Sequence, residues 1–260
     1  KKFSCWILLS NSFSQKVPVA SIGTLGIKIN NKITRTNLTT LDIISLHREL
    51  TKIKKLGIDN VILEASSHGL EQGRLEGLIF KTAIFTNFSQ DHLDYHKNMK
   101  NYLNAKLTLF SKLLKKKSHI ITDNEIPEFL KLKKIAKKNN LNLLTIGKKN
   151  STIQLKTVNP NSNYQNIIFT YKGKNYAVKI PLIGLFQIKN LFMSIIAAKL
   201  SDLEIKQILH AAENIKEVNG RLQLIKTTPN KTKIFVDYAH TPDALETILK
   251  TLKEHYKIKP

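Results

Sequence analysis

The sequence has a single cysteine, Cys5, among 260 residues, so an internal disulfide bond is excluded and a reducing compartment is favoured. It contains no apolar run of about 18 residues, the length that a membrane-spanning helix requires. Ser and Asn interrupt the short apolar stretch near the start, and no small-residue cleavage pattern follows, which argues against a signal peptide. The sequence therefore predicts a cytoplasmic protein with no membrane partner.

Acidic residues are also scarce, with 19 Asp and Glu against 42 Lys and Arg and a net charge of +23. A charge of this size raises nucleic-acid binding as a function class. However, the lysines form runs at 112–117 and 131–138 without interleaved aromatics, and the chain has only four arginines. Stacking platforms and bidentate base readers are therefore few. We interpret the runs as solvated helix faces and expect no nucleic-acid partner; the alternative predicts a DNA affinity that falls steeply with salt.

The densest polar chemistry follows two apolar runs. The run at 60–63 leads into residues 64–74 (EASSHGLEQGR), and the run at 83–87 leads into residues 91–96 (DHLDYH). Buried parallel strands deliver side chains to a site at their carboxyl ends, so we expect two adjacent strands that share one crevice. His92, Asp94 and His96 could alternatively form a zinc site, because H-x-x-x-H on a helix places both rings on one face; no cysteine or third well-spaced ligand accompanies them.

Helical and strand-like segments alternate along the chain, which predicts a mostly parallel α/β sheet. Three further strand-like segments, with a hairpin turn at 171–174, predict a small antiparallel sheet packed beside it. Ser201 and Thr241 are the expected N-caps of two later helices, the second having Pro242 at its first position. The expected helices are 3–14, 43–55, 99–114, 125–138, 184–200, 201–214 and 243–254; the expected strands are 17–23 (continuing to 26, toward a turn at 30–31), 60–64, 81–86, 119–122, 142–146, 153–158, 166–171, 176–180, 222–226 and 233–236.

The motifs EASSHGL with Gln72 and Arg74, FTN at 85–87, DHLDYH, Ala105-Lys106 and DYAHTP at 237–242 resemble the Mur ligase family. Their order along the chain makes the resemblance specific. It implies an ATP-dependent amide ligase of peptidoglycan synthesis, in the branch that adds the third amino acid to UDP-N-acetylmuramoyl-L-alanyl-D-glutamate through an acyl phosphate. The resemblance favours meso-diaminopimelate over lysine as that amino acid.

The resemblance also implies an architecture. Residues 1–220 would form the central domain that binds ATP and the UDP-linked substrate, and residues 221–260 would begin a Rossmann-like C-terminal ligase domain with its first βα unit. The protein would act as a monomer on the UDP-N-acetylmuramoyl-dipeptide, ATP and an amino acid.

Residue roles follow by matching the family's motifs. Glu64 and His92 would contact Mg²⁺, and Lys106 would be carbamylated by carbon dioxide into an anion that positions the metal. Such a lysine must be shielded from water, because only the neutral amine reacts. The substrate would be held by Thr39, Thr40, Ser66, Gln72 and Arg74, and the nucleotide by Asn190, Arg221, Asp237 and His240.

Two of these residues also have ordinary structural interpretations. The hydroxyl cluster at 36–42, which contains Thr39 and Thr40, could cap the helix that follows it. Arg74 could form a surface ion pair with Glu71 or Glu76.

Glycine-rich phosphate loops of the pattern G-x-x-x-x-G-K-[S/T] do not occur in the 260 residues, although the family has one before the position of residues 17–26. We therefore expect a chain truncated at both ends that holds the substrate and metal half of an active site and is inactive alone. The alternatives are a non-catalytic remnant that binds the UDP-muramoyl peptide, and a folylpolyglutamate-type ligase.

Overall fold

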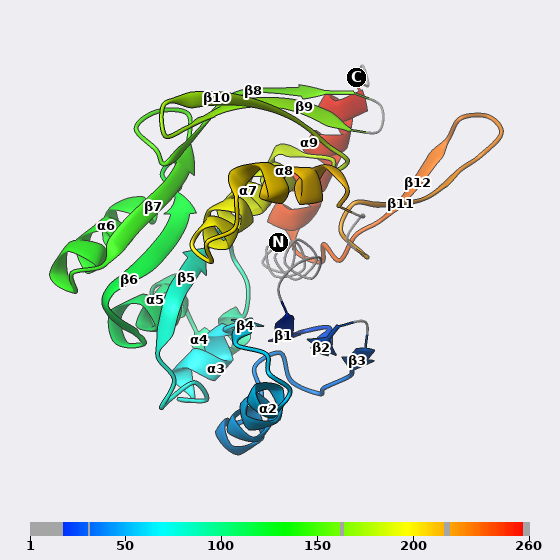
Figure 1. Ribbon diagram of the computed structural model, residues 1–260. Coiled ribbons are helices and arrows are strands. Elements are labelled where there is room, and N and C mark those ends of the chain that lie inside the picture. The colour runs from blue at the N-terminus through cyan, green and yellow to red at the C-terminus, as the bar shows by residue number, and fades with distance from the viewer. Residues whose placement is uncertain (1–17, 31, 162–163, 216–218, 257–260) are drawn as a thin grey trace.

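The computed structural model describes residues 18–30, 32–161, 164–215 and 219–256. Cys5 and the expected helix 3–14 lie outside them. The described chain forms three sheets, with strand orders β3-β2-β1-β4, β10-β9-β8-β7-β6-β5 and β11-β12. Figure 1 shows the first sheet beside α2, the second sheet with β5 to β7 at the left and β8 to β10 across the top, and the β11–β12 hairpin extending away from the body. Among the described residues no helix has the length and apolarity needed to cross a membrane.

The strands are β1 (Val19–Gly23), β2 (Gly26–Ile29), β3 (Lys32–Thr34), β4 (Asn60–Leu63), β5 (Phe80–Phe85), β6 (Leu114–Asp123), β7 (Asn142–Gly147), β8 (Ile153–Pro160), β9 (Gln165–Tyr171), β10 (Lys174–Ile180), β11 (Gln223–Thr227) and β12 (Lys233–Val236). The helices are α2 (Ile43–Lys55), α3 (Ser67–Glu71), α4 (Leu93–His96), α5 (Met99–Lys112), α6 (Phe129–Lys138), α7 (Leu185–Lys199), α8 (Ile205–Glu213) and α9 (Pro242–Tyr256).

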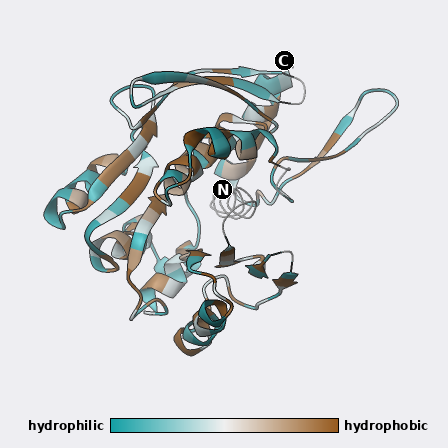
Figure 2. Ribbon diagram, in the orientation of Figure 1, coloured by the Kyte–Doolittle hydropathy of each residue, from teal (hydrophilic) through white to brown (hydrophobic). Residues whose placement is uncertain are grey.

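Helices cover both faces of the central sheet. Ile120 of β6 belongs to a core shared with α5 and α6, and its neighbour Ile121 belongs to a core shared with α7 and α8. Consecutive strand residues point to opposite faces, so an apolar pair of this kind requires cover on both sides. In Figure 2 the hydrophobic colour is concentrated on β5, β7 and α7, whereas the outer helix α6 alternates between hydrophobic and hydrophilic residues.

The predicted α/β class is confirmed, and β5, β6 and β7 pair in parallel as expected. The expectation of a separate antiparallel sheet is wrong. Strands β8, β9 and β10 do pair antiparallel, but β8 also pairs with β7, so the three strands extend the central sheet. The β9–β10 turn matches its prediction: Lys172 and Gly173 both have positive φ, of 48° and 74°, as a two-residue type I′ turn needs.

Two local predictions are wrong. The first strand ends at Gly23 instead of continuing, because the chain turns at Thr24 and Leu25 and returns as β2. Gly26 permits this return: its φ is +101°, and an added Cβ would lie 2.2 Å from the Thr34 carbonyl oxygen. Helix α8 begins at Ile205 with Glu204 as its N-cap residue, so Ser201 does not cap it.

Strands β4 and β5 also differ from expectation, because they are not neighbours in one sheet. Strand β4 pairs with β1, and β5 pairs with β6 in the other sheet. The polar segments that follow them nevertheless meet in one cavity, described below.

Candidate active site

A cavity of about 260 Å³ lies where the chain leaves β4 and β5. It is closed on another side by residues 237–241, which precede α9, and by α9 itself. Segments separated by more than a hundred residues in the sequence therefore form one site. Seven of the residues predicted from the sequence line it: Thr39, Glu64, Ser66, His92, Arg221, Asp237 and His240.

Glu64 is held at both its backbone and its carboxylate. The backbone N–H and the hydroxyl of Thr24 both donate to Glu64 Oε2, each at 2.9 Å, and the hydroxyl of Thr40 donates to the Glu64 carbonyl at 2.8 Å. None of these three bonds involves Oε1. Carboxylate oxygens are preferred Mg²⁺ ligands, so the donor chemistry of Glu64 fits that ion.

His92 is the N-cap residue of α4 and has a left-handed conformation, with φ of 54°. Its backbone N–H donates to Asp91 Oδ1 at 2.9 Å, and its Nε2 lies 3.4 Å from Asp91 Oδ2. The ring packs edge-on against His68 and Tyr102, with centroid separations of 5.0 and 5.9 Å. These contacts fix an imidazole that remains accessible from the cavity, because 42% of the side chain is exposed.

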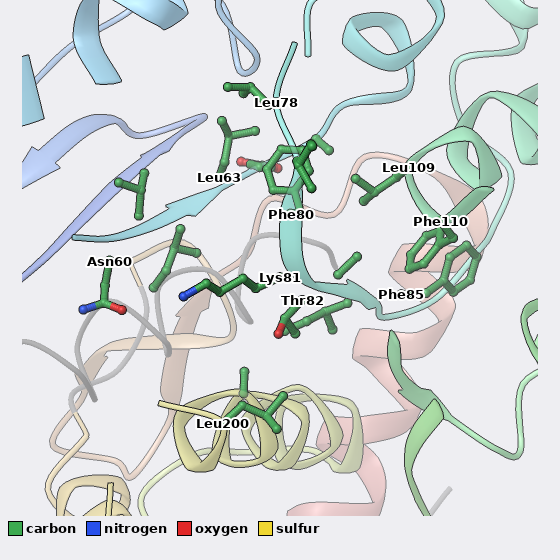
Figure 3. A pocket seen from close by; sticks show the side chains of 18 of the residues that line it. Asn60, Leu63, Leu78, Phe80, Lys81, Thr82, Phe85, Leu109, Phe110 and Leu200 are labelled. Atoms are coloured by element: carbon green, nitrogen blue, oxygen red, sulfur yellow. The ribbon is translucent and has the colours of Figure 1, made fainter. Parts of the chain in front are cut away.

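Lys106 lies on α5 and is only 6% exposed, unlike an ordinary helix-surface lysine. Its ammonium group lies 4.6 Å from the centroid of the Tyr102 ring. This lysine lines a second, larger and mainly apolar cavity of about 530 Å³ between β4 and β5, and Figure 3 shows the side chains of that cavity. Glu64 and Asn87 line both cavities, so they connect Lys106 to the polar site.

The predicted ligands fit magnesium better than zinc. Among the described residues no three His, Cys, Asp or Glu side chains are arranged to hold a metal ion. Magnesium does not need such a cage, because it usually keeps several waters and is bound by one or two carboxylates and substrate phosphates. Glu64 can supply such a carboxylate. A zinc site needs three or four protein ligands, which this cavity does not offer.

His92 lines the polar cavity but His96 does not, so the two rings cannot share a zinc ion there. It is 2% exposed, with Nε2 at 2.9 Å from Ser67 Oγ and Nδ1 at 2.9 Å from Glu71 Oε2. Burial lowers the pKa of His96; Glu71 opposes this shift, whereas the positive charge of Lys106 adds to it. A neutral His96 therefore joins α3 to α4 beneath the cavity.

The predicted substrate residues Thr40, Gln72 and Arg74 lie outside the residues that line the polar cavity and form a network with one another. Arg74 donates to Gln72 Oε1 from Nε and Nη2, at 2.9 and 2.5 Å, and from Nη1 to the Thr40 carbonyl at 2.8 Å. Gln72 donates from Nε2 to Tyr95 Oη at 3.0 Å. The structural interpretation of Arg74 as an ion pair with a neighbouring glutamate is thus replaced by hydrogen bonds to neutral oxygens.

The residues predicted to bind nucleotide separate into two groups. Arg221 is 8% exposed and its guanidinium lies 5.2 Å from the Tyr238 ring; burial lowers the pKa of Arg221, while Asp237 and Glu64 oppose that shift. Asp237 accepts from the N–H groups of Leu222 and Ala239, at 2.8 and 2.7 Å, which holds this loop against the cavity.

Asn190 belongs to the second group. It is buried within α7, where its carbonyl accepts from Ser194, and it does not line the polar cavity. The neighbouring Gln187 reaches further, donating to the Arg221 carbonyl at 3.4 Å. Helix α7 therefore supports the loop that contains Arg221, through Gln187. Asn190 itself does not reach the cavity.

Sequence reasoning assigned no role to Thr24, although it lines the cavity and contacts Glu64. Tyr238 and Phe186 were missed in the same way. Thr24 could have been found from its position, because it is a polar residue directly after the predicted strand 17–23. No local signal marks Phe186, because its place at the cavity depends on how α7 packs.

Comparison with known proteins identifies the family of the chain. The model of the Mur ligase middle domain matches residues 4–198, and the model of the Mur ligase glutamate ligase domain matches residues 220–260. The chain belongs to the Mur ligase family.

Several individual members of the family are similar to the chain. The UDP-N-acetylmuramoyl-L-alanyl-D-glutamate–2,6-diaminopimelate ligase of Rickettsia bellii (strain RML369-C) is 40% identical over 238 residues, covering 90% of this chain and 49% of that protein. A solved structure of a ligase with the same name superimposes with a TM-score of 0.81 and 32% identity, over 98% of this chain and 51% of the other. MurF ligase from Thermotoga maritima in complex with ADP shares the fold, with a TM-score of 0.71 and 17% identity, over 96% and 54% of the two chains. The chain spans about half the length of the curated relatives it matches.

Proposed function

We propose that this chain supplies part of the active site of an ATP-dependent amide ligase, namely the part that binds the substrate and the metal ion. The ligase would add meso-diaminopimelate to UDP-N-acetylmuramoyl-L-alanyl-D-glutamate in peptidoglycan synthesis. The observation that carries the proposal is that Glu64, Ser66 and His92 line the same polar cavity as Arg221 and Asp237. The names of the diaminopimelate ligases that resemble the chain support the choice of amino acid.

Amide formation from a carboxylate requires activation, and transfer of the ATP γ-phosphoryl group to the substrate oxygen makes the acyl phosphate that an amine can attack. Mg²⁺, when bound, supplies positive charge against the phosphate oxygens. Glu64 and His92 would hold it, and Lys106, shielded beside Tyr102, would carry the carbamate that positions it. Arg221 adds a fixed positive charge at the same cavity.

The two ligands would approach from different sides. Thr39 and Ser66 lie on the side of β1 and β4, where they would contact the UDP-muramoyl peptide. Thr40 accepts from the Ser66 N–H, and Arg74, which also bonds Gln72, donates to the Thr40 carbonyl, so these residues would hold the substrate side of the cavity in place. Asp237 and His240 lie on the side of α9 and would contact the nucleotide. The ADP bound by the MurF ligase of the same fold supports nucleotide binding here. We further propose that residues 1–220 and 221–260 belong to two domains of a cytoplasmic monomer.

Calorimetric titration tests both the proposed substrate binding and the proposed nucleotide binding. The chain should bind the UDP-N-acetylmuramoyl-dipeptide, and ADP with Mg²⁺ should bind more weakly to the His240→Ala variant. His240 is exposed and its ring bonds only the nearby Tyr238 carbonyl among described partners, so this variant should fold. His210→Ala, an exposed histidine on α8, is the matched control.

Phosphate release separates the alternatives. With ATP, the UDP-dipeptide and meso-diaminopimelate present, we expect binding without turnover, since the sequence contains no glycine-rich phosphate loop. Steady phosphate release by the chain would refute the proposal that it holds only part of the active site. Binding of a folylglutamate in place of the UDP-dipeptide would favour the folylpolyglutamate alternative, and binding of neither would refute the proposal.

A further inference from the structure

A chain of hydrogen bonds connects Thr39 to Glu64 through Thr24. Thr24 stands in the turn between β1 and β2, and its hydroxyl lies 2.9 Å from Glu64 Oε2 and 3.0 Å from the hydroxyl of Thr39. Its backbone N–H contacts the same carboxylate oxygen at 2.9 Å. All three residues line the polar cavity.

The direction of these bonds follows from counting protons. An ionised carboxylate only accepts hydrogen bonds, and a hydroxyl has one proton to donate. The proton of Thr24 is therefore directed to Glu64, and the bond between the two threonines must be donated by Thr39. The hydroxyl of Thr39 then has only lone pairs left for a bound ligand.

We propose that Thr24 is a positioning residue for the metal carboxylate and that it links this carboxylate to the substrate side of the cavity. The two bonds from Thr24 hold Oε2, so Oε1 of Glu64 is directed to a divalent cation. Thr40 fixes the backbone carbonyl of the same residue, so Glu64 can neither rotate nor shift freely. The proposal rests on the proposed function, because it assumes that Glu64 binds the cation.

A second consequence concerns the ligand. Because Thr39 can only accept, the ligand atom that it recognises must be an N–H or O–H donor, such as a sugar hydroxyl or an amide. A phosphate or carboxylate oxygen at that position would face lone pairs and would be repelled.

Binding of Mn²⁺, followed by the electron paramagnetic resonance signal of the free ion, tests the positioning role without requiring turnover. Loss of a residue that orients a metal ligand typically weakens metal affinity by about 10- to 100-fold. We expect Thr24→Val to weaken Mn²⁺ binding within this range, and Thr24→Ser, which keeps the hydroxyl, to bind as the unmodified chain does. Thr39→Val removes only the outer link and should cause a smaller loss.

Thr170→Val is the matched control. Thr170 also donates its hydroxyl to a side-chain oxygen near a hairpin turn, Asn175 Oδ1 at 2.7 Å, but it lies in β9, away from the cavity. Urea midpoints should be measured for every variant, because a purely structural role of Thr24 would lower stability without this ranked loss of metal affinity. If Thr24→Val does not fold, Thr39→Val decides the question: weaker Mn²⁺ binding than by Thr170→Val supports the inference, and equal binding overturns it.

Unchanged Mn²⁺ affinity in folded Thr24→Val overturns the inference. Absence of Mn²⁺ binding by the unmodified chain that still binds the UDP-dipeptide also overturns it, while the substrate half of the proposed function survives. If the unmodified chain binds neither Mn²⁺ nor the UDP-dipeptide, the proposed function itself is refuted.

Discussion

Replacing Thr40 by valine separates a structural role of this residue from the direct substrate contact that its motif suggests. The side chain is 1% exposed, and its hydroxyl makes two hydrogen bonds. It donates to the Glu64 carbonyl at 2.8 Å and accepts from the Ser66 N–H at 2.9 Å. Valine has nearly the same shape but neither bonding capacity, so the substitution removes the two bonds and leaves the packing largely intact.

The magnitude follows from the two backbone groups that lose their partner. Leaving one buried polar group without a hydrogen bond costs about 1–3 kcal/mol, so the loss for the pair should be about 3 kcal/mol in the free energy of unfolding. For a chain of this size, that change lowers the melting temperature by about 6–12 °C. The carbonyl of Glu64 would also lose its tether, so metal affinity should fall together with stability.

Urea unfolding followed by circular dichroism gives the comparison, with Thr36→Val as control. Thr36 donates its hydroxyl to the Leu38 carbonyl at 3.1 Å in a partly exposed loop, so its variant should remain within about 0.5 kcal/mol of the unmodified chain. Thr40→Ser should recover most of the stability. The reasoning is refuted if Thr40→Val unfolds like the unmodified chain and loses only affinity for the UDP-dipeptide, because that result assigns the hydroxyl to the ligand.

Three further predictions concern the support of the site. Gly69→Ala should lower the free energy of unfolding by about 1–3 kcal/mol, because the new Cβ would lie 2.7 Å from the side chain of Thr40; equal unfolding midpoints would contradict this. Because burial lowers the pKa of His96, its neutral form stabilises the fold above the ordinary pKa of 6.5, and stability should fall as pH drops below that value. His96→Gln should reduce the slope between pH 7 and 5, and an unchanged slope in urea titrations would count against the assignment. Burial alone would raise the pKa of Glu125, but the hydrogen bond and charge of Lys189 lower it overall, so its contribution is present above pH 4.5 and lost as pH falls further. The stability difference between Glu125→Gln and the unmodified chain should therefore shrink from pH 7 to pH 4; a constant difference would show that the ion pair does not matter.

The sequence by itself determined the local elements and the residue types of the site. Helix α2 was predicted at its observed bounds, because the apolar spacing of 43–55 and the cap at Asp42, which accepts from the Ser45 N–H at 2.9 Å, are short-range features. The carboxylate, hydroxyls and imidazole after the two apolar runs were likewise predictable, since polar residues that directly follow a buried strand often belong to a site at its carboxyl end.

Only the tertiary structure decided which segments meet and which way their side chains turn. The pairing of β8 with β7, and the separation of β4 from β5 into two sheets, depend on hydrogen bonds between strands distant in sequence, which alternation alone does not specify. His92 and His96 are four residues apart with the same chemistry, yet one lines the cavity and the other is buried against Ser67. Long-range packing made that choice, because burial and the available partners, and not spacing, determine where each ring can satisfy its nitrogens.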